Sequence, residues 1–237
     1  MNLNNKIIVI TGSGRSIGRV LALALAKEGA NIVLTARNKE EINSVKKEIE
    51  SQGGTAIAVK TDLSVEKDVV NLVKVVLEKW NKFDVLINNA GLVTDRVLNV
   101  DERELLDIPY NKWKYLFDVN LNTTFLCSKH FGKVMRDQKF GHIVNISSNL
   151  GKNVFKGFGA YSCAKAGVEH FTKILALELE DFNIKVNCLS PSYSIKIKER
   201  EFDNGLQGKN PEEMIDPVKK LCLTKISGKS FTVDTNI

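Results

Sequence analysis

The sequence predicts an α/β protein in which seven strands form one mostly parallel sheet with helices on both faces. Seven short runs rich in β-branched residues alternate with longer amphipathic stretches along the 237-residue chain. Most of these runs are apolar almost throughout, as strands covered on both faces are. Because strands and helices alternate, the strands are expected to be parallel and joined by right-handed crossovers.

The expected strands share this apolar, β-branched composition and span residues 6–11, 31–36, 55–60, 83–88, 141–147, 183–189 and 229–234. The first expected helix carries a buried stripe at helical spacing, made of Ile17, Val20, Leu21, Ala24 and Leu25. The other helices are expected at about residues 39–51, 65–80, 111–135 and 160–179. No linker interrupts this pattern, so we expect a single domain over residues 1–237. The charged segment 191–211 breaks the rhythm and is expected to form a lid over the site.

Composition excludes several classes of function. The net charge of +6 comes from 34 basic and 28 acidic residues spread along the chain, which favours a solvated surface with a mild preference for anions over a nucleic-acid face. The four cysteines and three histidines lack metal-ligand spacing, so we expect reduced thiols and no metal site. Neither a signal peptide nor a membrane span is evident, which predicts a cytoplasmic protein.

The stretch TGSGRSIG, residues 11–18, follows the first strand and opens the first helix. At such a turn the backbone can approach a pyrophosphate at the helix N-terminus only where side chains are small or absent. Gly12, Gly14 and Gly18 meet this requirement. A glycine-rich turn can also be purely structural, but the strand before it and the helix after it favour dinucleotide binding.

The end of the second strand bears on which dinucleotide is bound. An acidic residue there accepts a hydrogen bond from the ribose 2′-hydroxyl of NAD, whereas a nearby arginine accommodates the 2′-phosphate of NADP. Here the sequence is LTARN, with Arg37 and no carboxylate, and Arg15 in the first loop adds a second positive charge. We therefore expect NADP(H) to be preferred, with NAD(H) as the alternative. The competing interpretation is that both arginines are surface residues.

Three further motifs follow predicted elements in order: NNAG at residues 88–91, NISS at residues 145–148 and YSCAK at residues 161–165. Together with the first loop they resemble the short-chain dehydrogenase/reductase family of single-domain enzymes. The resemblance runs from about Lys6 to Pro191 and returns more weakly near the C-terminus. It implies a Rossmann-type doubly wound fold and hydride exchange between a nicotinamide cofactor and a carbonyl or secondary alcohol.

Tyr161 and Lys165 lie four residues apart at the start of a predicted helix, so they share one face. A phenol is a poor acid–base catalyst at neutral pH, but a neighbouring ammonium favours the phenolate and brings the pKa nearer the working range. The resemblance implies that Tyr161 is the general acid in reduction and that Lys165 binds the ribose. It also implies that Ser148 stabilises the substrate oxygen and that Asn120 anchors a proton relay.

The resemblance also implies a set of cofactor contacts. Asp62 would meet the adenine edge with Leu63 beside it, although Asp62 could instead be a helix N-cap. The complete expected set comprises Gly12, Ser13, Gly14, Arg15, Ser16, Ile17, Gly18, Arg37, Asp62, Leu63, Asn89, Ala90, Gly91, Tyr161, Lys165, Pro191 and Ser192.

Several features depart from the family pattern. Ser16 stands where a glycine is usual; we expect it to adopt an unstrained geometry and to place a hydroxyl near the phosphates. Ser192 replaces the glycine after Pro191, and the end TVDTNI lacks the usual glycine pair. The segment 91–113 is longer than usual and the segment 191–228 is shorter. Both border the substrate mouth in the family.

The sequence therefore predicts an NADP(H)-dependent oxidoreductase that interconverts a carbonyl and a secondary alcohol. A 3-oxoacyl thioester is the best candidate substrate, because 3-oxoacyl-acyl-carrier-protein reductases of fatty acid biosynthesis are common near relatives. A polyol, sugar or xenobiotic ketone is the alternative within the class, and a non-catalytic NADP-binding sensor or scaffold is the alternative outside it. The resemblance also implies that the helices that hold Asn120 and Tyr161 pack against a second subunit, giving a homodimer or homotetramer.

Overall fold

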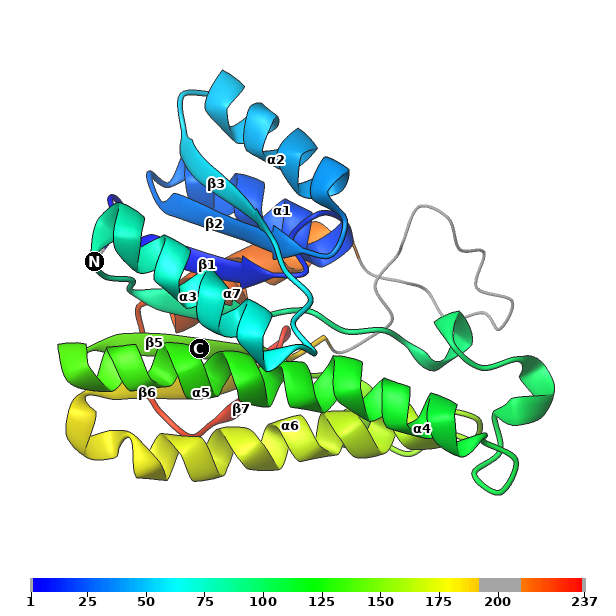
Figure 1. Cartoon of the computed structure of the whole chain (residues 1–237). Coiled ribbons are helices and arrows are strands. Elements are labelled where there is room, and N and C mark those ends of the chain that lie inside the picture. The colour runs from blue at the N-terminus through cyan, green and yellow to red at the C-terminus, as the bar shows by residue number, and fades with distance from the viewer. Residues whose placement is uncertain (1, 192–209, 236–237) are drawn as a thin grey trace.

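The computed structural model describes residues 2–191 and 210–235 and contains a seven-stranded sheet of order β3-β2-β1-β4-β5-β6-β7 (Figure 1). Every neighbouring pair of these strands is parallel. The strands are β1 (Ile7–Thr11), β2 (Asn31–Ala36), β3 (Thr55–Lys60), β4 (Val85–Asn88), β5 (Gly141–Ile146), β6 (Ile184–Ser190) and β7 (Ser230–Thr232). The predicted fold class is confirmed.

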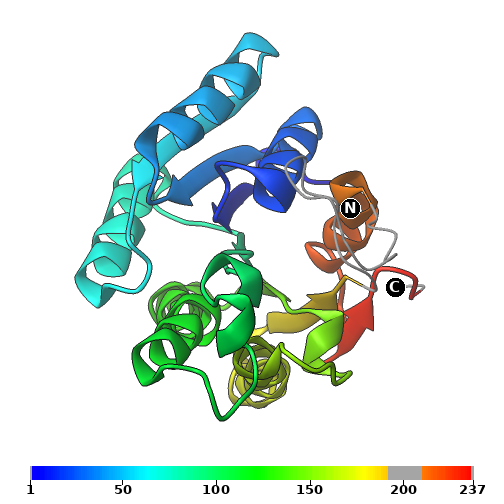
Figure 2. The same cartoon turned by 90° about the vertical axis from the view of Figure 1, so that its right-hand side faces the viewer.

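The helices follow the expected pattern with two differences. They are α1 (Ser16–Lys27), α2 (Lys39–Ser51), α3 (Glu66–Trp80), α4 (Tyr110–Phe117), α5 (Thr123–Gln138), α6 (Gly159–Glu178) and α7 (Ile215–Leu221). The helical stretch expected over residues 111–135 is present, but a π-helical turn, Asp118–Asn122, divides it into α4 and α5. Helix α7 lies in the shortened segment 191–228, where a trimmed helix after the lid was expected without a residue range. Helices α5 and α6 lie side by side, as both views show (Figures 1 and 2).

The sheet separates two hydrophobic cores, and β1 shows how its residues are divided between them. Ile8 and Ile10 belong to the core that also contains buried residues of α1, α2 and α7. Ile7 and Val9 belong to the core formed with α3, α5 and α6. All four side chains are buried, which explains why this strand is apolar without alternation.

Strand order reverses between β1 and β4, and in such sheets the crevice beyond the carboxyl ends of these two strands is the usual ligand site. The loops after β1, β4 and β5 lie at this edge, and so does Pro191, which directly follows β6. Most of the predicted lid, residues 191–211, falls outside the described residues. Within the described part of the chain, no helix is long and apolar enough to cross a bilayer. Cys127, Cys188 and Cys222 are buried, and Cys163 is exposed.

Candidate active site

The loop after β1 is tied to the loop after β4 across the reversal point. The backbone N–H groups of Asn89 and Ala90 donate to the Thr11 hydroxyl at 2.9 and 3.0 Å, and the Asn89 amide donates to the Thr11 carbonyl at 2.9 Å. Gly12 has a φ of +65°, and a Cβ there would lie 3.0 Å from the Ala90 Cα. The missing side chain at Gly12 therefore allows the two loops to approach each other.

The start of α1 is packed against the same turn. A Cβ on Gly18 would lie 2.2 Å from the Gly12 carbonyl oxygen, so only glycine permits this contact. Ser13 fixes the loop to β2, because its hydroxyl accepts from the Thr35 N–H at 2.9 Å. The residues fit a dinucleotide: a close, backbone-lined turn at a helix N-terminus is what a pyrophosphate requires. The Ile17 side chain packs against the core that contains Ile8 and Ile10, so only its backbone can contact a dinucleotide.

Ser16 corrects one expectation. Its φ is +47°, in the left-handed region that favours glycine, so the unstrained geometry expected from the sequence is wrong. The positive φ thus explains why a glycine is usual at this position in the family. The serine is held in place by the tight turn before α1 rather than by its own preference.

Arg37 and Asp62 lie at the carboxyl ends of β2 and β3, where the adenosine end of a dinucleotide is expected. Arg37 donates to the Tyr115 hydroxyl of α4 at 3.2 Å, and this hydrogen bond raises the pKa of Arg37 against the effect of partial burial. Partial burial opposes ionisation of Asp62, but hydrogen bonds from Ser64 and the charge of Arg37 lower the pKa of Asp62. Asp62 is not the helix N-cap, because Val65 holds that position.

Leu63 and Arg15 occupy opposite environments. Leu63 is buried in the second core, so its side chain serves packing, whereas Arg15 in the phosphate loop is exposed. At the other end of the site, the Asn149 N–H donates to the Pro191 carbonyl at 3.2 Å and joins the loops after β5 and β6. The predicted contact Ser192 lies outside the described residues.

The predicted pair Tyr161 and Lys165 shares one face of α6 at the carboxyl edge of the sheet. Both residues are buried, and the Lys165 Nζ lies 5.8 Å from the centroid of the Tyr161 ring. The Lys165 ammonium donates to the Ile146 carbonyl at 2.9 Å, which holds it at the end of β5. Burial lowers the pKa of Lys165 from 10.5 to about 8.

Ser148 is the second residue after β5 and lies at the same carboxyl edge of the sheet. Its Oγ accepts from the Leu150 N–H at 3.2 Å, so its own proton can be donated outward. The neighbouring Ser147 hydroxyl donates to the Lys165 carbonyl at 3.1 Å. This contact fixes the start of the Ser148 loop against α6.

Asn120 lies in the π-helical turn, a feature often found at functional sites. Its amide donates to the Leu92 carbonyl at 2.9 Å, and its Oδ1 accepts from the Leu92 N–H at 3.1 Å. Gly91 lies between this residue and Lys165: a Cβ at Gly91 would be 2.6 Å from the Asn120 Oδ1 and 3.4 Å from the Lys165 Nζ. The structure therefore brings Gly91, Asn120 and Lys165 together.

Glu169 is a site-supporting residue that sequence reasoning missed. It is buried on α6, and its carboxylate accepts from the hydroxyls of Ser190 at 2.6 Å and Ser230 at 2.5 Å. The Lys152 ammonium lies 3.8 Å from the same carboxylate. Glu169 thus joins β6, β7 and the loop after Ser148. Its spacing of four residues after Lys165 was the available signal, because it places both side chains on one helix face.

The long segment 91–113 packs beside the start of α6. A Cβ on Gly159 would lie 2.3 Å from the Leu105 Cδ2, so an aliphatic side chain of this segment reaches the turn two residues before Tyr161. An ion pair of 2.6 Å between Lys156 and Glu104 joins the same segments. Exposed apolar side chains gather on both: Leu105, Leu106, Val154 and Phe155.

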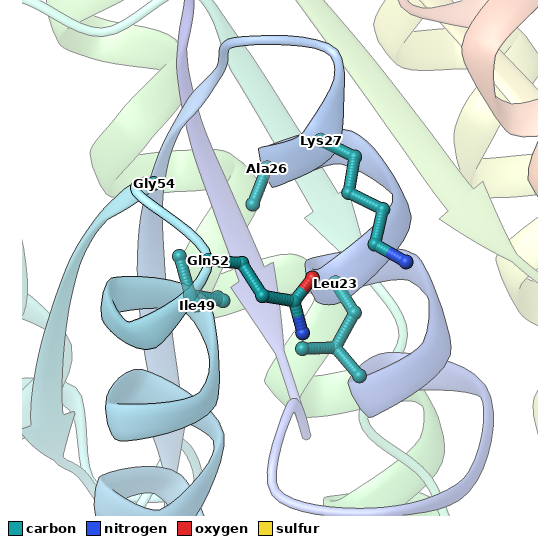
Figure 3. Close-up of a pocket in the computed structure, with 6 residues that line it drawn as sticks. All are labelled: Leu23, Ala26, Lys27, Ile49, Gln52 and Gly54. Carbon is teal, nitrogen blue, oxygen red and sulfur yellow. The ribbon is translucent and has the colours of Figure 1, made fainter.

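A small pocket of about 20 Å³ lies elsewhere, between the C-terminal ends of α1 and α2 (Figure 3). Leu23 of α1 lies beside the Gln52 side chain there, and Lys27 and Ile49 also line the pocket. Gly54 precedes β3, which places this pocket at the amino edge of the sheet, and its volume suits about one water molecule. Over residues 2–191 and 210–235, no three His, Cys, Asp or Glu side chains cluster closely enough to bind a metal.

Comparison with known proteins identifies the family. The family model of short chain dehydrogenases matches residues 6–196, and the chain therefore belongs to the short-chain dehydrogenase/reductase family of oxidoreductases. It is 38% identical to a 3-oxoacyl-[acyl-carrier-protein] reductase of Synechocystis sp. over 192 residues, which cover 81% of this chain and 75% of that protein. It is 31% identical to a reductase of the same name from Staphylococcus epidermidis, covering 98% of this chain and 88% of the relative.

Solved structures give the same result. A short-chain type dehydrogenase/reductase from Mycobacterium marinum superposes with a TM-score of 0.89 at 27% identity, covering 98% of this chain and 95% of that one. A 7α-hydroxysteroid dehydrogenase complexed with NADH and 7-oxo glycochenodeoxycholic acid superposes with a TM-score of 0.87 at 25% identity, covering 98% and 93%. The chain is thus a short-chain oxidoreductase that binds a nicotinamide dinucleotide.

Proposed function

We propose that this enzyme is an NADP(H)-dependent reductase that converts a carbonyl to a secondary alcohol, with Tyr161 as its general acid. The observation that carries the proposal is the buried Lys165, whose ammonium lies 5.8 Å from the centroid of the Tyr161 ring at the carboxyl edge of the sheet. An ammonium held in a poorly solvated environment favours the phenolate that proton donation leaves behind.

A nicotinamide held at this edge would, when bound in its reduced form, supply the hydride that the carbonyl carbon accepts. Tyr161 gives its phenolic proton to the carbonyl oxygen, and the O–H bond broken in the phenol is replaced by one in the alcohol. Ser148 donates a hydrogen bond to the same oxygen as negative charge develops on it. Lys165 stabilises the phenolate. Asn120, which is hydrogen-bonded to the Leu92 backbone, is proposed to anchor the relay that returns a proton from solvent to Tyr161. Gly12, Gly14 and Gly18 would line the pyrophosphate.

The substrate proposed is a 3-oxoacyl thioester. Two relatives that cover most of this chain carry the name 3-oxoacyl-[acyl-carrier-protein] reductase. Exposed Leu105, Leu106, Val154 and Phe155 next to the Tyr161 helix suit an acyl chain, and the net charge of +6 suits an acidic carrier.

The proposed assembly is a homodimer or homotetramer that pairs through α5 and α6. Phe125 of α5 and Phe171 of α6 are in edge contact, with ring centroids 6.3 Å apart. Ile174 and Leu177 continue this apolar face along α6 and are exposed. A second copy would cover these side chains.

The test is an activity screen with a matched pair of variants. Purified protein is mixed with NADPH and a panel of 3-oxoacyl thioesters, sugar ketones and xenobiotic ketones, and NADPH oxidation is followed. Tyr161→Phe should reduce turnover by about 10³-fold or more while cofactor affinity changes less than about threefold. Tyr110→Phe, at an exposed tyrosine of α4, should leave turnover unchanged.

Retained activity in Tyr161→Phe would refute the mechanism. NADPH binding without oxidation by any carbonyl would instead favour a sensor or scaffold. The preference for NADP(H) is proposed to depend on Arg37, so Arg37→Asp should reverse the ratio of NADPH to NADH affinity, and an unchanged ratio would refute this part.

A further inference from the structure

The side chain of Glu41, from the first turn of α2, lies against the phosphate loop. The sequence shows no carboxylate at the end of β2 and did not place Glu41 near this loop. A Cβ on Gly14 would be 2.8 Å from the Glu41 Cβ and 2.8 Å from its Oε2, so the Glu41 side chain crosses directly over Gly14. Glu41 is half-buried there. Because Gly14 has no side chain, the Glu41 carboxylate can lie directly against the loop. This role of Gly14 is separate from the one expected for it, which is to let the backbone approach a pyrophosphate.

The first turn of α2 fixes this position. The Asn38 side chain caps the helix and accepts from the backbone N–H groups of Glu40 and Glu41 at 3.0 and 3.1 Å. Further along α2, Glu48 is paired with Arg19, and Glu50 lies 3.5 Å from Lys46. Among the described residues, the ion pairs of α2 do not include Glu41. The Glu41 carboxylate instead lies against Gly14 of the phosphate loop.

The region beside Glu41 is the one expected to receive the ribose 2′ position, between the phosphate loop and the end of β2. Arg15 and Arg37 bring positive charge to it, and Arg37 already donates to Tyr115. Asp62 supplies a second carboxylate, and the Arg37 charge acts on it. The adenosine end thus carries two cations and two anions, which is a poorer environment for a dianionic phosphate than the two arginines alone.

We propose that Glu41 determines cofactor specificity by repelling the 2′-phosphate, so that this enzyme accepts both NADPH and NADH with only a modest preference for NADPH. The inference rests on the cofactor site of the proposed function. A carboxylate within a Debye length of a 2′-phosphate, in a partly buried setting, weakens binding by about tenfold. NADH lacks that phosphate and does not experience this repulsion.

The test measures dissociation constants for NADPH and NADH by fluorescence titration, which requires no turnover. Glu41→Gln keeps the size of the side chain and removes its charge, and it should raise the ratio of NADPH to NADH affinity about tenfold. Glu41→Lys should raise it further, to about a hundredfold. Glu40→Gln is the matched control, because it removes the same charge from the same helical turn at an exposed position and should change the ratio less than about threefold.

Equal ratios for wild type and Glu41→Gln, or equal changes for the Glu40 and Glu41 variants, would overturn the inference. The variant Arg37→Ala distinguishes a failure of the proposed role of Glu41 from a failure of the proposed NADP(H) preference. If Arg37→Ala lowers the ratio but Glu41→Gln leaves it unchanged, the NADP(H) preference stands and the role of Glu41 falls. If only Glu41→Gln changes the ratio, the role of Glu41 stands and that of Arg37 falls. If wild type binds neither dinucleotide, both are overturned.

Discussion

Replacing Lys165 by methionine is expected to remove turnover and also to stabilise the fold in a pH-dependent way. Burial lowers the pKa of Lys165 from 10.5 to about 8. The unfolded chain therefore holds this proton more tightly than the folded chain, and stability rises as pH increases from about 8 to 10.5. At neutral pH the charged lysine lowers the free energy of unfolding by about 3 kcal/mol, since each pKa unit corresponds to about 1.4 kcal/mol.

The same relation gives a smaller contribution at higher pH. At about pH 9.5 the folded lysine is already neutral, so the unfavourable contribution is only the cost of removing the proton that the unfolded chain holds at this pH, about 1.4 kcal/mol. Lys165→Met also removes the hydrogen bond to the Ile146 carbonyl, which has a length of 2.9 Å. That loss of about 1–3 kcal/mol is the same at both pH values, so it cancels when they are compared.

The assay is urea unfolding of wild type and Lys165→Met at about pH 7 and about pH 9.5. The stability of the variant relative to wild type should fall by about 2 kcal/mol between the two pH values. Lys173→Met, at an exposed lysine of the same helix, should show no such change. A relative stability of Lys165→Met that is the same at both pH values would refute the reasoning.

Three further variants test the structural account. Ser16→Gly relieves a φ of +47° and should raise the free energy of unfolding by about 1 kcal/mol, seen as an increase in Tm of about 2–4 °C; an unchanged or lower Tm would contradict the strain. Gly18→Ala places a Cβ 2.2 Å from the Gly12 carbonyl and should cost about 1–3 kcal/mol in thermal unfolding and weaken dinucleotide binding, whereas normal binding would show that the turn is not needed. Glu169→Gln loses a charged acceptor of two serine hydroxyls and should cost about 1–2 kcal/mol in urea unfolding, and a neutral effect would count against its supporting role.

The fold was predictable because the strands are marked by short apolar runs rich in β-branched residues. Each strand end in the structure lies within two residues of its expected place, since both faces of β1 and its neighbours are buried and their composition is apolar throughout. The π-helical turn at Asp118–Asn122 could not be predicted, because it preserves the apolar spacing on either side and changes only the local hydrogen bonding. Helix α7 is short, and its seven residues carry little periodic signal.

The candidate site shows the same division. Tyr161 and Lys165 were identified from the YSCAK motif and the family resemblance, and their spacing placed them on one helix face. Asn120 and Gly91 were identified from motifs at the ends of predicted elements. Glu41 was missed because its closeness to Gly14 depends on how α2 packs against the phosphate loop, which no local pattern encodes. The left-handed geometry of Ser16 was missed for a related reason, since the turn imposes a conformation that serine itself disfavours.

The central claim is that Tyr161 completes a hydride reduction, and isotope transfer tests it most directly. Wild type and Tyr161→Phe are each incubated with a 3-oxoacyl thioester and NADPH deuterated at the transferable position of nicotinamide, and the product is analysed by mass spectrometry. The account predicts one deuterium on the alcohol carbon with wild type and a product yield about 10³-fold lower with Tyr161→Phe. An alcohol without deuterium, or an undiminished yield from Tyr161→Phe, would contradict it.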